Sequence, residues 1–477
     1  MPSRDLAMPS VVILVADGAR PDTLAAAMDR GELPALSKLR AEGGLHTVTS
    51  VFPSVTGPAY TPFLMGRFPG PVGLPGIRWY DRERAITRWP AFSRSYVGLG
   101  LRELSRDLDP AAPTMFELVD SRLSALSVIE RGLARREKVA RGARFVTRAA
   151  FTHFRGDVSG WLAIDRHVGR LVADRIAHER PQFAFCALTG IDKASHALGH
   201  DAPLVRTAMQ IVDQTAARIR DDAERDGRWE QMHLWIVSDH GHSPVHTHED
   251  LAGLLRSHSV RTRAHPWTWG AGHRAAVMVS GNAMAHISLD LNRRNRPWWP
   301  ALAERWEWLT ELLLSRESTD LLILPVSAAE CEVRHRTRGV ARICWRGAQV
   351  SYLPQSGDPL GLGELRDLDS TDAHNATVSS EYPDALVQIS SLAASPRCGD
   401  IVLSAARGWD FRAKWEPIPH VSAHGALHRE HMAVPLLVNR PVAQTPLRTV
   451  DVFPTALAAL GLINPARCDG RSWLANA

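Results

Sequence analysis

This sequence has few cysteines and no long hydrophobic run, and each absence excludes a class of protein. Its 477 residues include five cysteines, with no close pair and no zinc-ribbon spacing. An odd, dispersed set is typical of a reducing compartment, so we expect most of them to be small core residues. No run of about 18 apolar residues occurs, so we expect no transmembrane helix. The cysteines are Cys186, Cys331, Cys344, Cys398 and Cys468.

The N-terminal residues, MPSRDLAMPS, are polar, so a cleavable signal peptide is not expected. They lead directly into the apolar run VVILVADG, which ends beside a candidate metal ligand, Asp17. We therefore expect a cytoplasmic protein without a membrane partner. The sequence also contains no internal repeat and no low-complexity segment.

Positive charge is in small excess. The formal net charge is +5, comes mainly from arginine and is spread along the chain, so no nucleic-acid partner is expected. A mild basic excess suits a small anionic substrate. The 45% hydrophobic and 22% charged residues are ordinary for a soluble globule. At roughly 100–200 residues per domain, the length allows residues 1–477 to form one large catalytic domain with insertions.

Short apolar runs precede or follow the turns that carry polar side chains. The runs VVILVA, FAFCAL, LWIVS and AVPLLV have the length of buried strands, and helical patterns such as APLVRTAMQIVDQTAARIRDDAERD and TALAALGL lie between or after them. This alternation predicts an α/β fold, with a central mostly parallel sheet covered by helices on both faces. Ligands of such sheets bind beyond the carboxyl ends of the strands.

Two stretches interrupt the alternation. Residues from about 80 to 160 are rich in arginine and include EKVARGARFVTRAAFTHF, and residues from about 250 to 420 contain most of the tryptophans. We interpret both as insertions that form a cap or a substrate-selecting region over the site. Among the tryptophans, four could stack on a base but are more often packing residues: Trp267, Trp269, Trp298 and Trp299.

Three aspartates and three histidines stand where these runs end or at glycine-flanked turns. Asp192 and His196 are one helical turn apart, so both can face one ion, although Asp192 could instead cap a helix. Adjacent ligands can share an ion only at a strand end or tight turn, which LWIVSDHGH supplies. The six candidate metal ligands are Asp17, Asp192, His196, Asp239, His240 and His424.

Other polar side chains near these motifs have simpler interpretations. Asp22 follows Pro21 and is expected to cap the next helix. A second set of histidines is expected to lie at the surface or behind the ligands: His200, His242, His246 and His248.

Thr56 lies in VFPSVTGPAYTPFLMG, a turn followed by a helix. A threonine hydroxyl is a poor nucleophile at neutral pH, but a bound divalent cation can lower its pKa. The helix N-terminus beside it would offer N–H groups to an anion. The simpler alternative is that Thr56 is only a helix N-cap.

Taken together, these seven positions resemble the alkaline phosphatase superfamily, and within it the type I phosphodiesterase/nucleotide pyrophosphatase branch. The similarity covers most of residues 10–80, 183–245 and 420–462, including VADGARPDTL, FPSVT, LPGIRWYD, SDHG, AHG and VDVFPTALAALGL. The resemblance implies an alkaline phosphatase-like α/β/α sandwich. Over the two insertions we recognise little similarity.

The resemblance also implies a ligand set for two divalent metal ions. Asp192, His196 and His424 resemble the ligands of one zinc. The other would be held by Asp17, Asp239 and His240, and Thr56 matches the nucleophile that touches this second metal. Ligation rich in histidine favours zinc, although manganese accepts the same nitrogen and oxygen ligands.

Departures from the family pattern bear on the substrate. Ala59 stands where the branch commonly has a phosphate-binding asparagine three residues after the nucleophile, and Ile77 stands at a second such position. Tyr60 replaces the arginine of the sulfatase motif, and Thr56 cannot become formylglycine, so a conventional sulfatase is not expected. The Tyr60 hydroxyl is a candidate donor to the substrate in place of the missing amide.

The resemblance predicts a two-metal hydrolase of phosphoric esters, working on a phosphodiester or nucleotide pyrophosphate through a phospho-threonine. Two alternatives share the metals and nucleophile: a phosphomonoesterase and a phosphonate hydrolase. A phosphomutase has no supporting feature. A non-catalytic binding protein of the same fold is a further alternative, opposed by the presence of all seven positions. The sequence predicts neither the natural substrate nor the oligomeric state.

Overall fold

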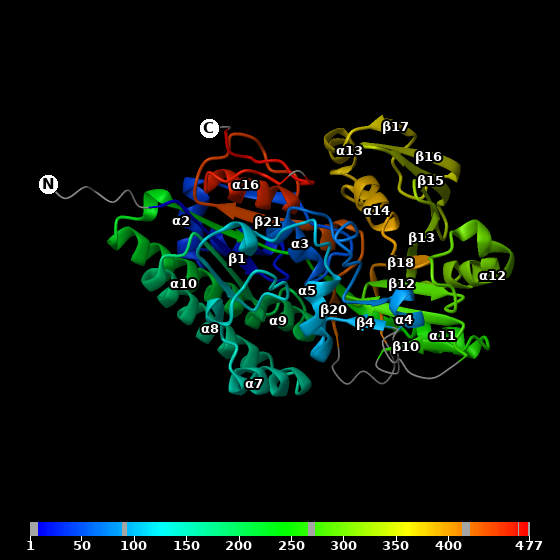
Figure 1. Ribbon diagram of the computed structural model, residues 1–477, viewed down its shortest axis with the longest axis horizontal. Coiled ribbons are helices and arrows are strands. Elements are labelled where there is room, and N and C mark those ends of the chain that lie inside the picture. Colours follow the sequence, from blue (N-terminus) through cyan, green and yellow to red (C-terminus); the bar gives the residue numbers. More distant parts are fainter. Residues whose placement is uncertain (1–7, 88–92, 266–271, 413–419, 466, 476–477) are drawn as a thin grey trace.

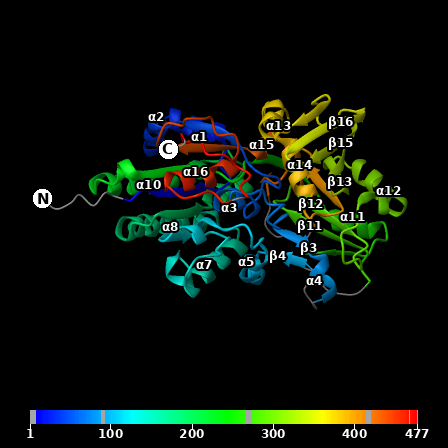
Figure 2. The same ribbon diagram turned by 45° about the horizontal axis from the view of Figure 1, so that its top comes forward.

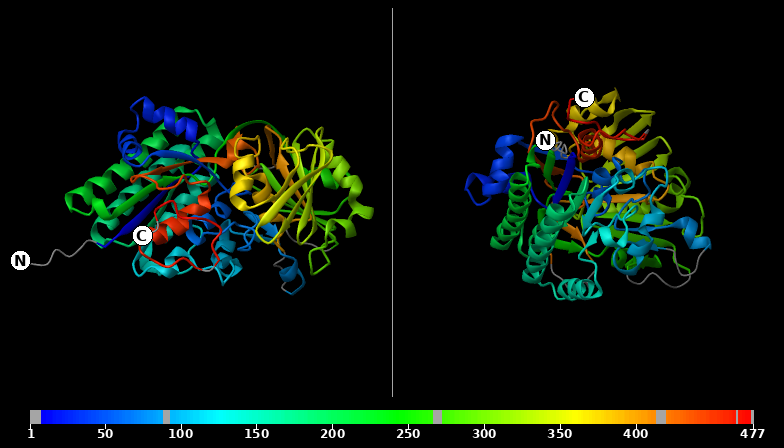
Figure 3. Two further views of the ribbon diagram at one scale, coloured as in Figure 1. Left: turned by 90° about the horizontal axis from the view of Figure 1, so that it is seen from above. Right: turned by 60° about the vertical axis from the view of Figure 1, so that its left-hand side comes forward.

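The computed structural model describes residues 8–87, 93–265, 272–412, 420–465 and 467–475 of the chain. Two large sheets lie along the long axis of the molecule, one towards each end (Figure 1). The view from above shows the same division (Figure 3).

The first sheet has seven strands and is built from the apolar runs identified in the sequence. Its pairs are parallel from β8 across to β6, whereas β21 is antiparallel to β8 and β2 is antiparallel to β21. The mostly parallel sheet that the sequence predicts is therefore confirmed. The spatial order is β2 (Leu45–Thr49), β21 (Ala433–Val438), β8 (Met232–Val237), β1 (Ser10–Ala16), β7 (Phe183–Leu188), β5 (Arg122–Ala125) and β6 (Lys138–Val139).

Helices cover both faces of this sheet. Alternate residues of β1 point to opposite sides, so each set of apolar side chains is buried against the helices on its own face. Val12 and Leu14 join one buried core, and Ile13 and Val15 join another. Burying such a side chain contributes about 1.5–3 kcal/mol. The first core packs against α1 (Pro21–Asp29), α2 (Pro34–Glu42), α8 (Val158–Glu179) and α10 (Pro203–Arg225). The second packs against α3 (Thr61–Met65), α6 (Met115–Leu118) and α16 (Val452–Ala459). Helices α8 and α10 lie side by side (Figures 1 and 2).

The second sheet has nine strands, and all of them come from the interval of about 250–420. Its neighbouring strands are antiparallel except for β10 and β11. The order is β10 (Thr262–Ala264), β11 (Ala275–Ser280), β12 (Met284–Leu289), β18 (Ile401–Ala405), β13 (Thr319–Ser327), β14 (Glu330–His335), β15 (Gly339–Arg346), β16 (Gln349–Gly357) and β17 (Leu365–Leu368). It packs against α11 (Leu251–Ser257), α12 (Ala303–Leu314), α13 (Ser370–Thr377) and α14 (Ala385–Ala393) through cores of its own.

The interval of about 80–160 has two structural roles. Strands β5 and β6 belong to it, so it completes one edge of the seven-stranded sheet. It also supplies α7 (Ala143–Phe154), which packs on α8, and β4 (Ser93–Ser95), which pairs with β3 (Arg78–Tyr80). That the two intervals select the substrate stays a prediction. None of the described helices is long and apolar enough to span a bilayer.

Strands β8, β1 and β7 are parallel neighbours, so their carboxyl ends meet at one edge of the sheet. Asp17 follows β1, Asp239 and His240 follow β8, and α9 (Gly190–Leu198) follows β7 with Asp192 and His196. A three-stranded sheet of β19 (Gly408–Phe411), β9 (Ser243–Glu249) and β20 (Ser422–Ala423) ends beside His424. Thr56 lies between β2 and the short helix η1 (Pro58–Tyr60). Five distant segments of the chain therefore converge on one edge.

Candidate metal centre

Thr56 and two of the predicted ligands form one half of a buried cluster. The Thr56 hydroxyl oxygen lies 3.3 Å from Asp17 Oδ1 and 3.2 Å from His240 Nε2. His240 Nε2 lies 3.4 Å from Asp17 Oδ1 and 3.5 Å from Asp239 Oδ2. Asp17, Asp239 and His240 are almost fully buried, whereas Thr56 is half-buried and reachable from solvent. This arrangement presents one hydroxyl to a buried set of ligands.

Asp192 is the centre of the other half. Its Oδ1 lies 3.2 Å from His196 Nε2 and 3.5 Å from His424 Nε2. The first turns of α9 place Asp192 and His196 on one side of the helix, as their spacing predicts. The two halves touch, because the rings of His240 and His424 stack with their centroids 3.5 Å apart. All seven predicted residues therefore lie in one cluster.

Backbone carbonyls orient the three predicted histidine ligands. The ring Nδ1 of His196 is 2.8 Å from the Ser422 carbonyl, that of His424 is 2.9 Å from the Ser54 carbonyl, and that of His240 is 3.2 Å from the Gly241 carbonyl. A carbonyl only accepts a hydrogen bond, so each Nδ1 carries the proton and donates. The nitrogen left to bind a metal is then Nε2 in each ring, and it points into the cluster, as metal ligation requires.

His242 belongs to the cluster, although from the sequence we expected it to lie at the surface or behind the ligands. Its Nε2 lies 3.0 Å from Asp192 Oδ1, and its Nδ1 lies 3.2 Å from the Ser422 hydroxyl. Burial lowers the pKa of His242 to about 3, so the ring is neutral. The feature of the sequence that could have identified His242 as a cluster residue is its position two residues after His240. His246 and His248 are exposed on β9, and His200 pairs with Asp201 outside the cluster.

The carboxylates of the cluster need a cation. Burial, together with repulsion from Asp239 and Asp192, raises the pKa of Asp17 to about 7. Asp239 Oδ2 is buried without a hydrogen-bond partner among the described residues. Ligand atoms lie within 4.8 Å of one another in two groups, the first Asp192, His196, His242 and His424, and the second Asp17, Asp192 and His240. Such oxygen and nitrogen donors fit zinc or manganese.

Lys193 places a positive charge at the centre. Its ammonium group lies 2.7 Å from Asp192 Oδ2, and 32% of its side chain is exposed. Burial opposes ionisation of Asp192, but Lys193 and His196 hold the pKa of this carboxyl well below its ordinary value. The partly exposed ammonium can therefore reach both the ligand carboxylate and an anion arriving from solvent. No pattern in the sequence predicts this role for Lys193.

The neighbours of Thr56 shape the space around its hydroxyl. Ala59 is fully buried and offers no hydrogen-bonding side chain. The Tyr60 hydroxyl is buried without a hydrogen-bond partner among the described residues, and its ring packs edge-on against Phe185. The Tyr96 hydroxyl donates to the Thr56 carbonyl. Gly57 has φ +98°, and a Cβ there would lie 2.4 Å from the Tyr96 oxygen, so this position requires glycine.

The tryptophans offer little support for base stacking. Trp299 is buried in the core of the second sheet. The Trp298 ring stacks under the Arg296 guanidinium at 4.3 Å. Trp267 and Trp269 lie outside the described residues.

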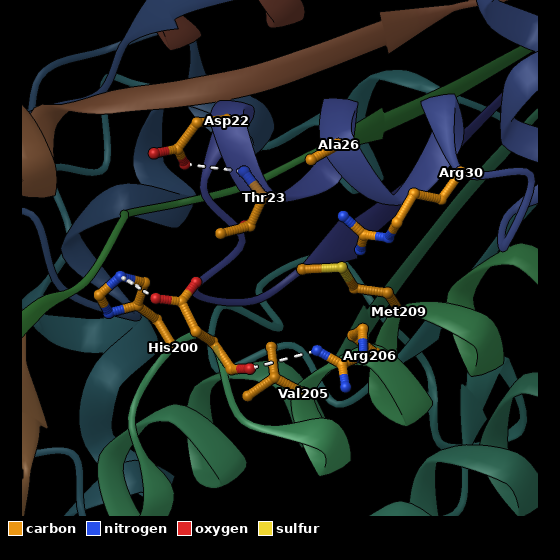
Figure 4. A pocket seen from close by; sticks show the side chains of 9 residues that line it. Asp22, Thr23, Ala26, Arg30, His200, Val205, Arg206 and Met209 are labelled. Carbon is orange, nitrogen blue, oxygen red and sulfur yellow. Dashed lines mark hydrogen bonds and ion pairs between the residues drawn. The ribbon is translucent and has the colours of Figure 1, made fainter.

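A cavity of about 240 Å³ lies between α1 and α10, and it contains none of the predicted ligands (Figure 4). His200 and Asp201 line one side of it, and Asp22 lines another. Asp22 lies in the first turn of α1, whose N-cap is Arg20. Arg20 connects this region to the cluster because it binds Asp22 and donates to the His242 carbonyl at 2.7 Å.

His242→Gln is expected to weaken zinc binding by about 10–100-fold while leaving the number of bound ions unchanged. The reason is that His242 orients Asp192 from behind, through the 3.0 Å contact. Zinc affinity measured by competition with a chromogenic chelator checks this. His246→Gln, an exposed histidine four residues away, is the matched control. Loss of a whole zinc equivalent would instead make His242 a direct ligand.

Zinc binding is expected to strengthen as the pH rises. In the metal-free protein the pKa of Asp17 is raised to about 7. Burial opposes protonation of His240, but Asp239 and Asp17 raise the pKa of its ring to about 9. A cation must displace these protons, so the zinc association constant should rise by up to about tenfold per pH unit between about 7 and 9, and more steeply below 7. A chelator competition series across this range measures the slope, and a flat profile would contradict the prediction.

The raised pKa values of Asp17 and His240 also make the stability of the metal-free protein depend on pH. Both folded-state pKa values are raised, from ordinary values of 3.8 for Asp17 and 6.5 for His240. Each group therefore stabilises the fold at low pH and loses that contribution as the pH passes through its folded value. The melting temperature of the metal-free protein should therefore fall between about pH 4 and 9 relative to that of the zinc-loaded protein.

Comparisons with known proteins fit this geometry. A family model described as type I phosphodiesterase / nucleotide pyrophosphatase matches residues 11–427. No match to the chain is found among curated protein sequences.

Solved structures of similar fold cover almost the whole chain. Phosphonoacetate hydrolase from Sinorhizobium meliloti 1021, in complex with phosphonoacetate, has a TM-score of 0.58 and 17% identity over 95% of this chain and 96% of that one. An inactive variant of murine ectonucleotide pyrophosphatase / phosphodiesterase 5, in complex with AMP, has a TM-score of 0.58 and 13% identity over 97% of both chains. The human protein has a TM-score of 0.56 and 14% identity, again over 97% of both chains. The fold is alkaline phosphatase-like, as the sequence predicts.

Proposed function

The chain belongs to the type I phosphodiesterase / nucleotide pyrophosphatase family, and from this premise we propose that it hydrolyses a phosphodiester or nucleotide pyrophosphate bond through a phospho-threonine at Thr56. Family membership makes it a metal-dependent phosphoryl hydrolase. The observation that carries the finer proposal is the position of the Thr56 hydroxyl, which lies within 3.3 Å of both Asp17 and His240.

Two divalent cations fit the cluster. We propose that Asp17, Asp239 and His240 hold the cation beside Thr56. The other would be held by Asp192, His196 and His424, with His242 orienting Asp192. Zinc suits the three imidazoles best, and manganese accepts the same donors. Bound cations would lower the pKa of the Thr56 hydroxyl and offset negative charge on the phosphoryl group.

The chain's own groups suit an in-line displacement. The Thr56 hydroxyl points its proton at Asp17 Oδ1. When Thr56 Oγ1 bonds to phosphorus, that proton is lost, the bond from phosphorus to the leaving oxygen breaks, and the leaving oxygen takes a proton from water. Water then cleaves the Thr56–phosphate ester and restores the hydroxyl. Two inversions give net retention of configuration at phosphorus.

A phosphomonoesterase or phosphonate hydrolase is the second candidate, and two observations favour it. Ala59 has no amide to bind a diester phosphate, and Lys193 adds a positive charge that suits a dianionic group. Among the solved neighbours, the phosphonoacetate hydrolase is bound to phosphonoacetate, and an inactive variant of another protein is bound to the nucleotide AMP.

Turnover of bis(p-nitrophenyl) phosphate, p-nitrophenyl phosphate and phosphonoacetate by zinc-loaded protein separates these candidates. A higher kcat/KM for the diester supports the proposed phosphodiesterase. A higher kcat/KM for the monoester or the phosphonate would replace it with the second candidate. Full zinc occupancy with no turnover of any phosphoryl ester would favour a binding protein.

Lys193→Met is expected to lower kcat/KM for p-nitrophenyl phosphate about 10–100-fold more than for the diester, because an ammonium group attracts a dianion more strongly than a monoanion. Methionine keeps the length of the side chain and removes its charge. Lys193→Arg, which keeps the charge, is the control. An equal loss for both substrates would mean that Lys193 acts on Asp192 alone.

A reducing compartment is consistent with the state of the thiols, and we propose that the protein is cytoplasmic. All five cysteines are free, and three of them are buried: Cys186, Cys331 and Cys398. Their burial fits the expected role as small core residues.

A further inference from the structure

Helix α7 exposes large apolar side chains that no core residue covers. Phe151 is 61% exposed and Phe154 is 77% exposed, and Val146 is 56% exposed. On the opposite side of the helix, Phe145 and Ala149 pack against the core of the first sheet. The helix is therefore apolar on two faces, and only one of them serves the fold.

The exposed residues form one continuous strip. Val146, Ala150 and Phe154 are spaced four residues apart, and Phe151 lies next to them, so they share one side of the helix. We call these four residues the outer face of α7. Three large exposed apolar side chains within nine residues are unusual on a surface that only meets water.

The charges on α7 and at its C-terminal end are all positive. The stretch 138–156 contains three arginines on or just after the helix and no aspartate or glutamate, whereas Lys138 and Arg141, before the helix, both pair with Glu130. Among the described residues, none of the three makes an ion pair, and the Arg155 guanidinium lies over the Phe151 ring at 5.0 Å. The three are Arg144, Arg148 and Arg155.

Two further exposed apolar side chains lie beside the metal centre. Leu198 is 49% exposed and ends α9, and Val421 is 42% exposed and donates its N–H to the His196 carbonyl. Figure 1 shows α7 along the lower edge of the molecule, beside α8.

We propose that the outer face of α7 docks this protein on a membrane surface that contains anionic lipid, which replaces the expectation from the sequence that it has no membrane partner. Phe151, Phe154 and Val146 would enter the headgroup region, and the arginines would bind lipid phosphates. With 12 residues, α7 is too short to span a bilayer, so the contact is peripheral. A second copy of the chain is a poorer occupant, because it would bring the same arginines and no acidic residue on this helix to pair them.

Sedimentation of the zinc-loaded full chain with lipid vesicles tests the proposal. Vesicles of phosphatidylcholine alone are compared with vesicles that also contain phosphatidylglycerol. We expect binding only to the anionic vesicles, weakening as salt is added. Phe151→Ser/Phe154→Ser and, separately, Arg144→Gln/Arg148→Gln/Arg155→Gln should each lower the partition coefficient by about tenfold or more.

Trp308→Ser is the matched control, because Trp308 is a 40% exposed aromatic residue on α12 and should leave partitioning unchanged. Turnover of a small soluble ester should be the same in all variants, which shows that they are folded. Equal binding to both kinds of vesicle, or none by the wild type, would overturn the proposal. A dimer that the phenylalanine pair abolishes, without vesicle binding, would assign the face to a second copy.

Discussion

Thr56→Ala is expected to lower kcat/KM on the preferred phosphoryl ester by a factor on the order of 10⁴ or more. Among the described residues, the Thr56 hydroxyl is the nucleophile placed beside Asp17 and His240, at 3.3 and 3.2 Å. Alanine removes that oxygen and leaves the six ligands in place. Because Thr56 is half-buried and does not cap a helix, stability and zinc content should change little. Steady-state kinetics with zinc analysis of the same preparations measures both quantities.

Thr56→Ser provides the positive control, since it keeps the hydroxyl and removes one methyl group. Acid quench of the wild type during turnover, followed by mass spectrometry, should find phosphate on the peptide that contains Thr56. Turnover that survives in Thr56→Ala would show that water attacks phosphorus directly, and the phospho-threonine would then be wrong even though the family assignment stands.

The fold could be predicted because its signals are local. The run VVILVA became β1, FAFCAL became β7, and the helical pattern after Asp192 became α10. Parallel neighbours end at the same edge, so the rule that strand ends carry ligands was enough to gather Asp17, Asp192 and Asp239. These expectations needed only residue pattern and the geometry of parallel strands.

The contacts around the ligands could not be predicted from local sequence patterns, because they join residues far apart in sequence. His242 approaches Asp192 across 50 positions, and the Tyr96 hydroxyl reaches the Thr56 carbonyl across 40. Strands β5 and β6 also could not be predicted from local sequence patterns. Their short, partly polar sequences carry little strand signal. Strand β5 belongs to the sheet because it pairs with β7, and β6 belongs to it because it pairs with β5.

Asp192→Asn is expected to have the second largest effect, lowering kcat/KM by a factor on the order of 10³ and reducing zinc content. Asp192 is the residue common to both groups of candidate ligands, and its Oδ1 lies within 3.5 Å of three imidazoles. Asparagine keeps the shape and removes the charge that holds a cation. It also leaves the Lys193 ammonium without its partner, which adds positive charge where the cation should sit.

Asp22→Asn is the matched control for this substitution. Asp22 lies on α1 beside the same edge of the sheet, and its exposed carboxylate pairs with Arg20 and with no imidazole of the cluster. Zinc content and turnover should therefore stay at wild-type values. If Asp192→Asn instead kept both zinc equivalents and lost only turnover, Asp192 would be acting on the substrate, and the cation assigned to it would have to be held by His196, His242 and His424 alone. Zinc content thus separates a ligand from a substrate-binding group without relying on activity.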